Sequence, residues 1–307
     1  MKKTQERRDI YAQVTDKIIA ELEKGERPWH KPWNAAGHAA GSISLPLRHN
    51  LQPYSGINVL MLWVDAMEKN FTAPIWMTFK QALELGGAVN KGEHGSLVVF
   101  GKTNTKTESD EVTGEETERK VTFMKGYTVF NVEQISGLPA HFYATAEAPR
   151  LDESQRLAHA EQFFANTGFT VRHGGNKAYY SLTRDTIQMP PFESFNDPES
   201  YYSTLAHESG HATRHPNRLD RDFGQKAFGD DAYALEELIA ELVSCFVCAD
   251  LGIAASERDD HAAYIGGWLK ALKNDKRLIF KAAAHAQRAV EFLHSLQASD
   301  ESLEHAA

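Results

Sequence analysis

Two histidines and a glutamate stand close together in the second half of the chain, in the sequence His207-Glu208-Ser209-Gly210-His211. On a helix, side chains at positions i and i+4 lie one above the other, so both imidazoles can reach one metal ion. The glutamate beside the first histidine can accept a proton from a metal-bound water. Because coordination lowers the pKa of that water from about 15.7 to about 7, the motif predicts a hydrolytic metal site with Glu208 as its base.

A third metal ligand is expected from another helix further along the chain. Glu237 follows His211 by 26 residues, within an expected helix over 233–251. Three protein ligands leave one coordination position open for water. Glu236 is the competing candidate, but it projects about 100° away round the helix, toward a more apolar face. We therefore predict His207, His211 and Glu237 as ligands of Zn²⁺, with Mn²⁺ or another divalent ion as the alternative.

The expected helix over 233–251 carries three further residues that could take part in a metal site. Glu241 stands one turn beyond Glu237 and could hold a ligand histidine through the second nitrogen of its ring. Cys245 and Cys248 belong to the same helix, where small apolar side chains suit the core. Since the sequence has no second cysteine pair, these two do not predict a structural zinc site.

The metal ligands need a helical framework, and the second half of the sequence predicts one. Apolar residues recur with helical spacing over 153–166, 201–215, 233–251, 261–272 and 277–296. Short strand-like pieces at 178–182 and 186–189 precede the helix with the two histidines. A few strands followed by stacked helices is an α+β arrangement. We predict a mostly helical, zincin-like domain with a small sheet over residues 150–307.

The first half predicts a second α+β domain over residues 1–149. Helices are expected over 10–22, 57–67 and 78–85, the last with Thr78 as its N-cap. Strands are expected over 96–100 and 121–132. The polar and highly charged stretch 103–120 between them predicts a mobile, solvated hairpin excursion. The boundary is placed near Pro149, in a stretch typical of a linker.

Charge and aromatic residues indicate a polyanionic partner for the first half. Residues 1–106 carry 14 Lys and Arg against 10 Asp and Glu, a net charge of +4, although the whole chain carries −9. Single-stranded nucleic acid is commonly bound by aromatic side chains beside a basic groove. Trp63 belongs to an apolar helix and fits a place in the core. Trp29 and Trp33 stand in a loop rich in proline and cations, which is harder to bury. The predicted nucleic-acid contacts are Trp29, Lys31, Trp33, Arg48, Tyr54, Trp76 and Lys80.

Composition excludes several protein classes. No apolar run approaches the roughly 20 residues that a membrane helix needs. The opening MKKTQERRDI has no apolar segment, so a secretory signal is not expected. With two cysteines in one expected helix, a disulfide framework is excluded and a reducing compartment is favoured. We expect a cytoplasmic protein.

Six segments, in order and spacing, resemble the ArdC antirestriction proteins and the N-terminal part of TraC-type plasmid primases. They are EKGERPWHKPW (23–33), PYSGINVL (53–60), WMTFKQALELGG (76–87), YTVFNVEQISGLP (127–139), YYSTLAHESGHATRHPNRLDR (201–221) and EELIAE (236–241). The resemblance implies a domain that binds single-stranded DNA and a metallopeptidase-like domain in which Glu208 is catalytic. It also implies that the protein shields incoming plasmid DNA from host restriction during conjugation.

One departure from the usual metallopeptidase pattern weakens the expectation of peptidase activity. Ser209-Gly210 replaces a bulkier apolar residue, and glycine within a helix costs about 1 kcal/mol relative to alanine. We expect Gly210 to permit close packing near the ion. The alternative hypothesis is a gluzincin-like metalloprotease that acts on a host protein, such as a restriction component, and uses the first half to recognise it. Salt-dependent affinity for single-stranded DNA would favour the first hypothesis. The sequence leaves the oligomeric state open.

Overall fold

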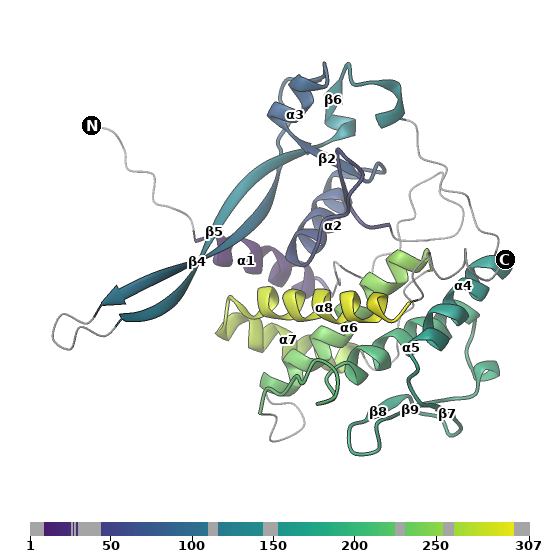
Figure 1. The fold of residues 1–307 in the computed structure, drawn as a ribbon. Coiled ribbons are helices and arrows are strands. Elements are labelled where there is room, and N and C mark those ends of the chain that lie inside the picture. The colour runs from purple at the N-terminus through teal and green to yellow at the C-terminus, as the bar shows by residue number, and fades with distance from the viewer. Residues whose placement is uncertain are drawn as a thin grey trace, which may run out of the picture.

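The computed structural model describes residues 9–25, 27, 29, 44–109, 116–143, 153–224, 231–253 and 261–297. The architecture is α+β, as predicted, and the described residues form a four-stranded and a two-stranded sheet in the first half of the chain and a three-stranded sheet in the second. The helices of the second half lie beneath the first sheet and its helices (Figure 1). Within the described ranges, no helix is long and apolar enough to span a membrane.

The first half is organised round a four-stranded sheet of order β1-β2-β5-β4. β1 and β2 are parallel, and β5 pairs antiparallel with both β2 and β4. A separate pair joins β3 to β6. The elements are α1 (Ile10–Glu23), β1 (Leu47–Arg48), α2 (Ile57–Lys69), β2 (Ile75–Thr78), α3 (Phe79–Glu84), β3 (Ala88–Val89), β4 (Ser96–Ser109), β5 (Glu116–Asn131) and β6 (Ile135–Ser136).

Local chemistry explains how α3 begins and ends. The Thr78 side chain accepts a hydrogen bond from the backbone N–H of Gln81, and the Gln81 side chain accepts one from the backbone N–H of Thr78. This reciprocal cap confirms Thr78 as the predicted N-cap. The helix ends just before Gly86, which adopts a φ of +83° that other residues rarely reach.

The charged stretch predicted as a hairpin excursion is a two-stranded antiparallel ribbon, so the hairpin is confirmed, whereas its interpretation as a solvated loop was wrong. The ladder between β4 and β5 continues without interruption from the pair Ser96–Val129 to the pair Ser109–Glu116. Threonine alternates along β4 at positions 103, 105 and 107, and β-branched residues favour extended backbone. High charge alone therefore does not exclude a strand. The ribbon projects away from the helical body of the molecule (Figure 1).

The second half places a three-stranded sheet beside a helical bundle. The sheet has the order β7-β9-β8, so β8 is an edge strand. Asp197 caps α5 through its carboxylate, and Pro198 occupies the first turn, as at many helix starts. The elements are α4 (Glu153–Asn166), β7 (Val171–His173), β8 (Tyr179–Ser181), β9 (Thr186–Met189), α5 (Pro198–Ala212), α6 (Asp231–Leu251), α7 (His261–Asn274) and α8 (Leu278–Ser295).

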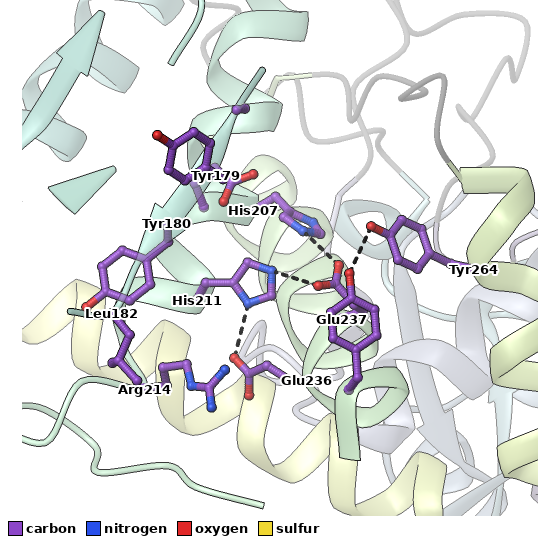
Figure 2. Close-up of a pocket in the computed structure, with 12 residues that line it drawn as sticks. Tyr179, Tyr180, Leu182, His207, His211, Arg214, Glu236, Glu237 and Tyr264 are labelled. Atoms are coloured by element: carbon purple, nitrogen blue, oxygen red, sulfur yellow. Dashed lines mark hydrogen bonds and ion pairs between the residues drawn. The ribbon is translucent and has the colours of Figure 1, made fainter. Parts of the chain in front are cut away.

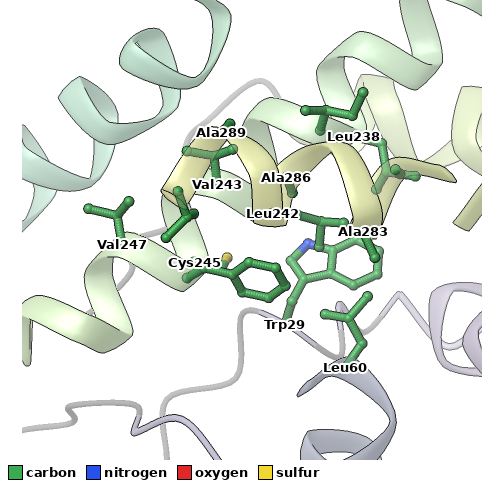
Figure 3. Close-up of a cluster of buried hydrophobic side chains, with 14 of the residues drawn as sticks. Trp29, Leu60, Leu238, Leu242, Val243, Cys245, Val247, Ala283, Ala286 and Ala289 are labelled. Carbon is green, nitrogen blue, oxygen red and sulfur yellow. The ribbon is translucent and has the colours of Figure 1, made fainter. Parts of the chain in front are cut away.

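One hydrophobic core joins the two halves of the chain. Residues of α1 and α2 share a single cluster with residues of α5, α6, α7 and α8. The Trp63 ring lies 5.9 Å from that of Phe246, so Trp63 is a core residue, as predicted. Trp29 contacts Trp268 of α7 at the same centroid distance, 5.9 Å. Figure 3 shows Trp29 and Leu60 packed against α6 and α8. The boundary proposed near Pro149 lies outside the described residues.

Candidate metal centre

The two histidines of the motif lie side by side on α5. Their ring centroids are 4.9 Å apart, and both side chains are almost completely buried. The helix can bring them close to α6 because Gly210, between them, has no side chain. A Cβ at this position would lie 3.1 Å from Cα of Ala240 and 3.1 Å from Cβ of Val243. Gly210 therefore permits the close packing that its place in the motif suggested.

The carboxylate of Glu237 on α6 lies against both imidazoles. Its Oε2 is 3.6 Å from Nε2 of His207, and its Oε1 is 3.5 Å from Nε2 of His211. One ligand atom from each of the three residues lies within 4.8 Å of the others. Two imidazole nitrogens and one carboxylate oxygen are donors suited to a divalent transition metal. The structure thus brings together the three residues predicted as ligands.

The acidic surroundings of the two imidazoles favour a cation at this place. Burial lowers the pKa of His211, but the neighbouring carboxylates of Glu237 and Glu236 outweigh it and raise that pKa to about 10. Burial raises the pKa of Glu237, but His211 and His207 lower it by a larger amount. The pKa of Glu237 therefore lies well below its usual range. A metal ion would supply the same positive charge.

Glu236 does not face apolar residues, so that expectation was wrong. Its Oε1 lies 3.2 Å from Nδ1 of His211, the nitrogen that faces away from Glu237 (Figure 2). Arg221 donates two hydrogen bonds of 2.8 Å to the Glu236 carboxylate and a further one of 3.0 Å to the carbonyl of Gly210. Glu236 therefore orients a ligand histidine and is itself fixed by a buried arginine.

Glu241 occupies the corresponding position behind the other histidine. Its Oε2 lies 3.5 Å from Nδ1 of His207. That nitrogen makes no hydrogen bond within the described part of the chain, so the contact is electrostatic at this separation. Arg27, from the first half, donates a 3.1 Å hydrogen bond to Oε1 of Glu241. The structure thus places Glu241 where a carboxylate can support His207.

A cleft of about 260 Å³ opens onto the three candidate ligands (Figure 2). Glu208 lines it beside the histidines, as a base acting on a metal-bound water should. The hydroxyls of Tyr233 and Tyr264 lie 3.2 Å apart at its wall. Burial, Tyr264 and Glu237 all raise the pKa of Tyr233, which keeps its proton. The edge strand β8 contributes Tyr179 and Tyr180.

Both halves of the chain match known protein families. Residues 8–130 match the family described as the N-terminal domain of anti-restriction factor ArdC. Residues 158–285 match the family described as zincin-like metallopeptidase. The metal-free structure of the antirestriction ArdC protein from the R388 plasmid is 46% identical, with a TM-score of 0.76, over 94% of this chain and 97% of that one. The chain belongs to the ArdC antirestriction family.

Further relatives agree with this placement in the ArdC family. The Mn(II)-bound structure of the R388 protein is 43% identical, with a TM-score of 0.75, over 95% of this chain and 99% of that one. The uncharacterized protein y4eC of Sinorhizobium fredii is 42% identical over 94% of this chain and 92% of its own length. DNA primase TraC of Escherichia coli is 36% identical over 94% of this chain, which spans 27% of that primase.

Two of the predicted nucleic-acid contacts are buried, so those assignments were wrong. Trp29 has no exposed surface and Trp76 is 1% exposed, and an enclosed indole has no face on which a base can stack. Lys31 and Trp33 lie outside the described residues. Arg48 is exposed above the ring of Tyr54, 5.4 Å from its centroid. Lys80 is 85% exposed near Glu84, so Arg48 and Lys80 remain accessible to a ligand, whereas Tyr54 is partly buried against the core.

Sequence reasoning missed the two arginines that hold the supporting carboxylates. Arg221 and Arg27 follow no helical spacing with respect to the HExxH motif, so no local pattern connects them to it. The assignment of Cys245 and Cys248 to the core is confirmed, because both thiols are free and fully buried. Burial raises the pKa of Cys248 to about 12, which keeps it protonated and unreactive.

Proposed function

We propose that this protein binds single-stranded DNA through its first half and protects incoming DNA from host restriction during conjugation, in the cytoplasm. The strongest support is the match to the R388 antirestriction protein, which extends over both halves and 97% of that chain. A match confined to the metal centre would support a zincin-like fold alone. The segment shared with TraC, a DNA primase, adds support for a DNA partner.

We propose that a divalent ion, Zn²⁺ or Mn²⁺, binds between His207, His211 and Glu237. Both ions accept imidazole nitrogen and carboxylate oxygen as donors, and the R388 relative has an Mn(II)-bound structure. When bound, such an ion acidifies a coordinated water and polarises a carbonyl group. Glu208 lies in the same cleft, where it can take up a proton. Tyr233, protonated at the cleft wall, can donate a hydrogen bond to a developing oxyanion.

The role of Glu208 separates DNA coating from proteolysis. If protection comes from coating of the DNA, Glu208→Ala protects a transferred plasmid as well as the wild type does. We expect this result, because Ser209-Gly210 departs from the usual metallopeptidase pattern. The test measures transfer into a restricting host, alongside metal content and affinity for an oligonucleotide. Loss of protection with folding, metal content and DNA affinity intact would show that coating is not sufficient.

A metallopeptidase acting on a host restriction component is the second candidate function. The observation that favours it is the edge strand β8, which lines the cleft through Tyr179 and Tyr180 beside Glu208. An extended peptide can pair with an exposed strand edge and so lie across the candidate ligands. Cleavage of a co-expressed restriction subunit by the wild type, and not by Glu208→Ala, would support this function.

A further inference from the structure

The ribbon formed by β4 and β5 has two chemically different faces. In an antiparallel ladder, directly opposite residues share a face, as do residues two apart along one strand. At the base of the ribbon, one face carries the pairs Val98–Tyr127 and Phe100–Lys125, so that two rings and a cation lie next to one another. The opposite face carries the pairs Val99–Gly126 and Gly101–Met124 at this level, with neither an aromatic ring nor a cation.

The base of the ribbon shows how this face meets solvent. Phe100 is 58% exposed and Tyr127 is 39% exposed. Lys125 lies over the ring of Tyr127, with its Nζ 5.0 Å from the ring centroid. Val98, opposite Tyr127, is buried in a cluster with Trp76. The exposed aromatic surface therefore begins where the core of the sheet ends, at the base of the projecting ribbon (Figure 1).

We propose that this face of the ribbon is the surface that binds single-stranded nucleic acid. Phe100 and Tyr127 stack on bases, and Lys125 contacts the phosphate backbone. Rings that alternate with cations fit such a strand, because it offers a π-face at every base and a negative charge at every phosphate. An apolar protein partner would leave the charge of Lys125 without a counterion. This assignment rests on the proposed DNA-binding function and replaces the buried Trp29 and Trp76.

The test measures binding of a fluorescent oligothymidylate to the full-length protein at low salt. The double variant Phe100→Ala/Tyr127→Ala should bind at least about tenfold more weakly, since each stacked ring contributes to affinity. Lys125→Ala should reduce the slope of log affinity against log salt by about 0.7, the value for one phosphate contact to a single strand. Phe79→Ala is the matched control, because Phe79 is 51% exposed, lies beside Lys80 and stands outside the ribbon.

The outcomes separate this assignment from the proposed function. If the wild type binds the oligonucleotide and the double variant binds equally well, the ribbon is not the binding surface. If Phe79→Ala weakens binding and the double variant does not, the α3 surface holds the strand instead. If the wild type does not bind at low salt, the proposed DNA-binding function and the ribbon assignment both fail.

A separate observation connects the first half to the metal centre. Arg27 precedes the family's zincin-like segment by more than a hundred residues, yet it is 7% exposed and reaches Glu241 on α6. Glu241 in turn faces His207. This series of contacts mirrors the one from Arg221 through Glu236 to His211. Each candidate ligand histidine thus has a carboxylate behind it, and each carboxylate has an arginine.

Trp29 holds the same segment against the wall of the cleft. Its ring meets that of Trp268 edge-on at 5.9 Å, and Trp268 stacks on Tyr264 at 6.1 Å. Tyr264 lines the cleft. Two residues of the first half are therefore connected to the site. Arg27 acts through an ion pair with Glu241, and Trp29 through aromatic contacts with Trp268 and Tyr264.

We infer that Arg27 is a positioning residue for the metal centre, supplied from outside the zincin-like segment. It holds the Glu241 carboxylate toward His207, and a carboxylate behind a ligand histidine fixes the ring and strengthens its basicity. Removal of Arg27 would remove a hydrogen bond that holds Glu241 in its place beside His207. Metal affinity should therefore depend on a residue of the half that we propose to bind DNA.

The test measures affinity for Zn²⁺ and for Mn²⁺ by competition with a fluorescent chelator. Arg27→Ala and Glu241→Gln should each weaken binding about 10- to 100-fold. The double variant should be no weaker than the worse single one, because both act on one contact. Arg27→Lys should restore part of the affinity. Thr15→Ala is the structural control, since fully buried Thr15 also contacts the second half, through a 2.6 Å hydrogen bond to the carbonyl of Lys276.

Equal metal affinity of folded Arg27→Ala and wild type would overturn this inference, as would additive effects in the double variant. Weakening by Thr15→Ala to the same degree would show that general loosening of the two halves is the cause. A wild type that binds neither ion would instead refute the proposed metal centre itself. Melting temperatures of the metal-free variants show whether a loss of affinity accompanies a loss of folding.

Discussion

At the scale of single residues, neighbouring glutamates on α6 have different roles. Glu237 lies against the Nε2 atoms of both histidines, whereas Glu236 lies behind His211 and is held by Arg221. We expect Glu237→Ala to lose nearly all bound metal and Glu236→Gln to retain it with weakened affinity. Metal analysis after gel filtration distinguishes these results. Retention by Glu237→Ala together with loss by Glu236→Gln would reverse the assignment.

Glu236 also has a role in stability, because it neutralises a buried arginine. Removing one partner of a buried ion pair typically costs about 3–5 kcal/mol, since the other charge is left uncompensated. Arg221 is 5% exposed and Glu236 is 2% exposed. Glu236→Ala should therefore lower the free energy of unfolding by about this amount in metal-free protein. Urea denaturation measures it, and the paired variant Arg221→Met/Glu236→Leu should be the more stable of the two.

The sequence predicted those residues whose relations are local. His207, Glu208 and His211 form a motif with helical spacing, and Glu237 and Glu241 share one helical face. Arg27 and Arg221 could not be found in this way, because their contacts arise when distant segments fold together. The composition round Trp29 was misleading for the same reason. Prolines and cations favour exposure of a loop, but Arg27 and Trp29 are buried against the second half of the chain.

At the scale of elements, the approach of α5 to α6 depends on Gly210. By helix propensity alone, Gly→Ala would stabilise the protein by about 1 kcal/mol. A Cβ here would instead meet Cα of Ala240 and Cβ of Val243 at 3.1 Å, so we expect a loss of about 1–3 kcal/mol and weaker metal binding. Gly266→Ala on α7 is the matched control, because nothing lies within 4 Å of its added Cβ. Thermal unfolding should show opposite shifts for the two variants.

His285 on α8 should make stability depend on pH. Burial and the nearby Arg288 and Arg221 lower its pKa to about 4, against about 6.5 in an unfolded chain. Between these values the unfolded chain binds a proton that the native protein does not. The contribution of His285 to the free energy of unfolding is therefore fully present above about pH 6.5, and it is lost as pH decreases toward 4. His285→Gln should lose less stability between pH 7 and 5 than the wild type, as measured by urea denaturation, and equal losses would contradict this.

Elements were predicted where a periodic apolar pattern exists. The helices of the second half follow such a pattern, and the cap of α3 follows from the polar residue Thr78. The β4–β5 ribbon does not, because its composition resembles that of a solvated loop. The sequence did contain threonine in alternation with cations and aromatic residues. This alternation has the two-residue period of a strand, but it does not define an apolar face.

At the scale of the whole molecule, two segments that match separate families share one core. Composition changes near Pro149 suggested a linker between independent modules, and charge asymmetry supported that interpretation. The contacts of α1 and α2 with α7 and α8 show that the apolar faces of the first half are completed by the second. A boundary between families therefore does not mark a boundary between cores.

The shared core predicts that the two halves unfold together. Trp63 reports on α2 and Trp268 on α7, and both are buried where the halves meet. Urea denaturation should give one transition, with tryptophan fluorescence and far-UV circular dichroism coincident, as for a single cooperative unit. A fragment ending near Pro149 would expose the apolar faces of α1 and α2, and should aggregate or bind a hydrophobic dye. Two resolved transitions in the full chain, or a monomeric fragment with native circular dichroism, would show instead that each half folds alone. In that case Arg27 would reach Glu241 by docking of one folded unit onto another.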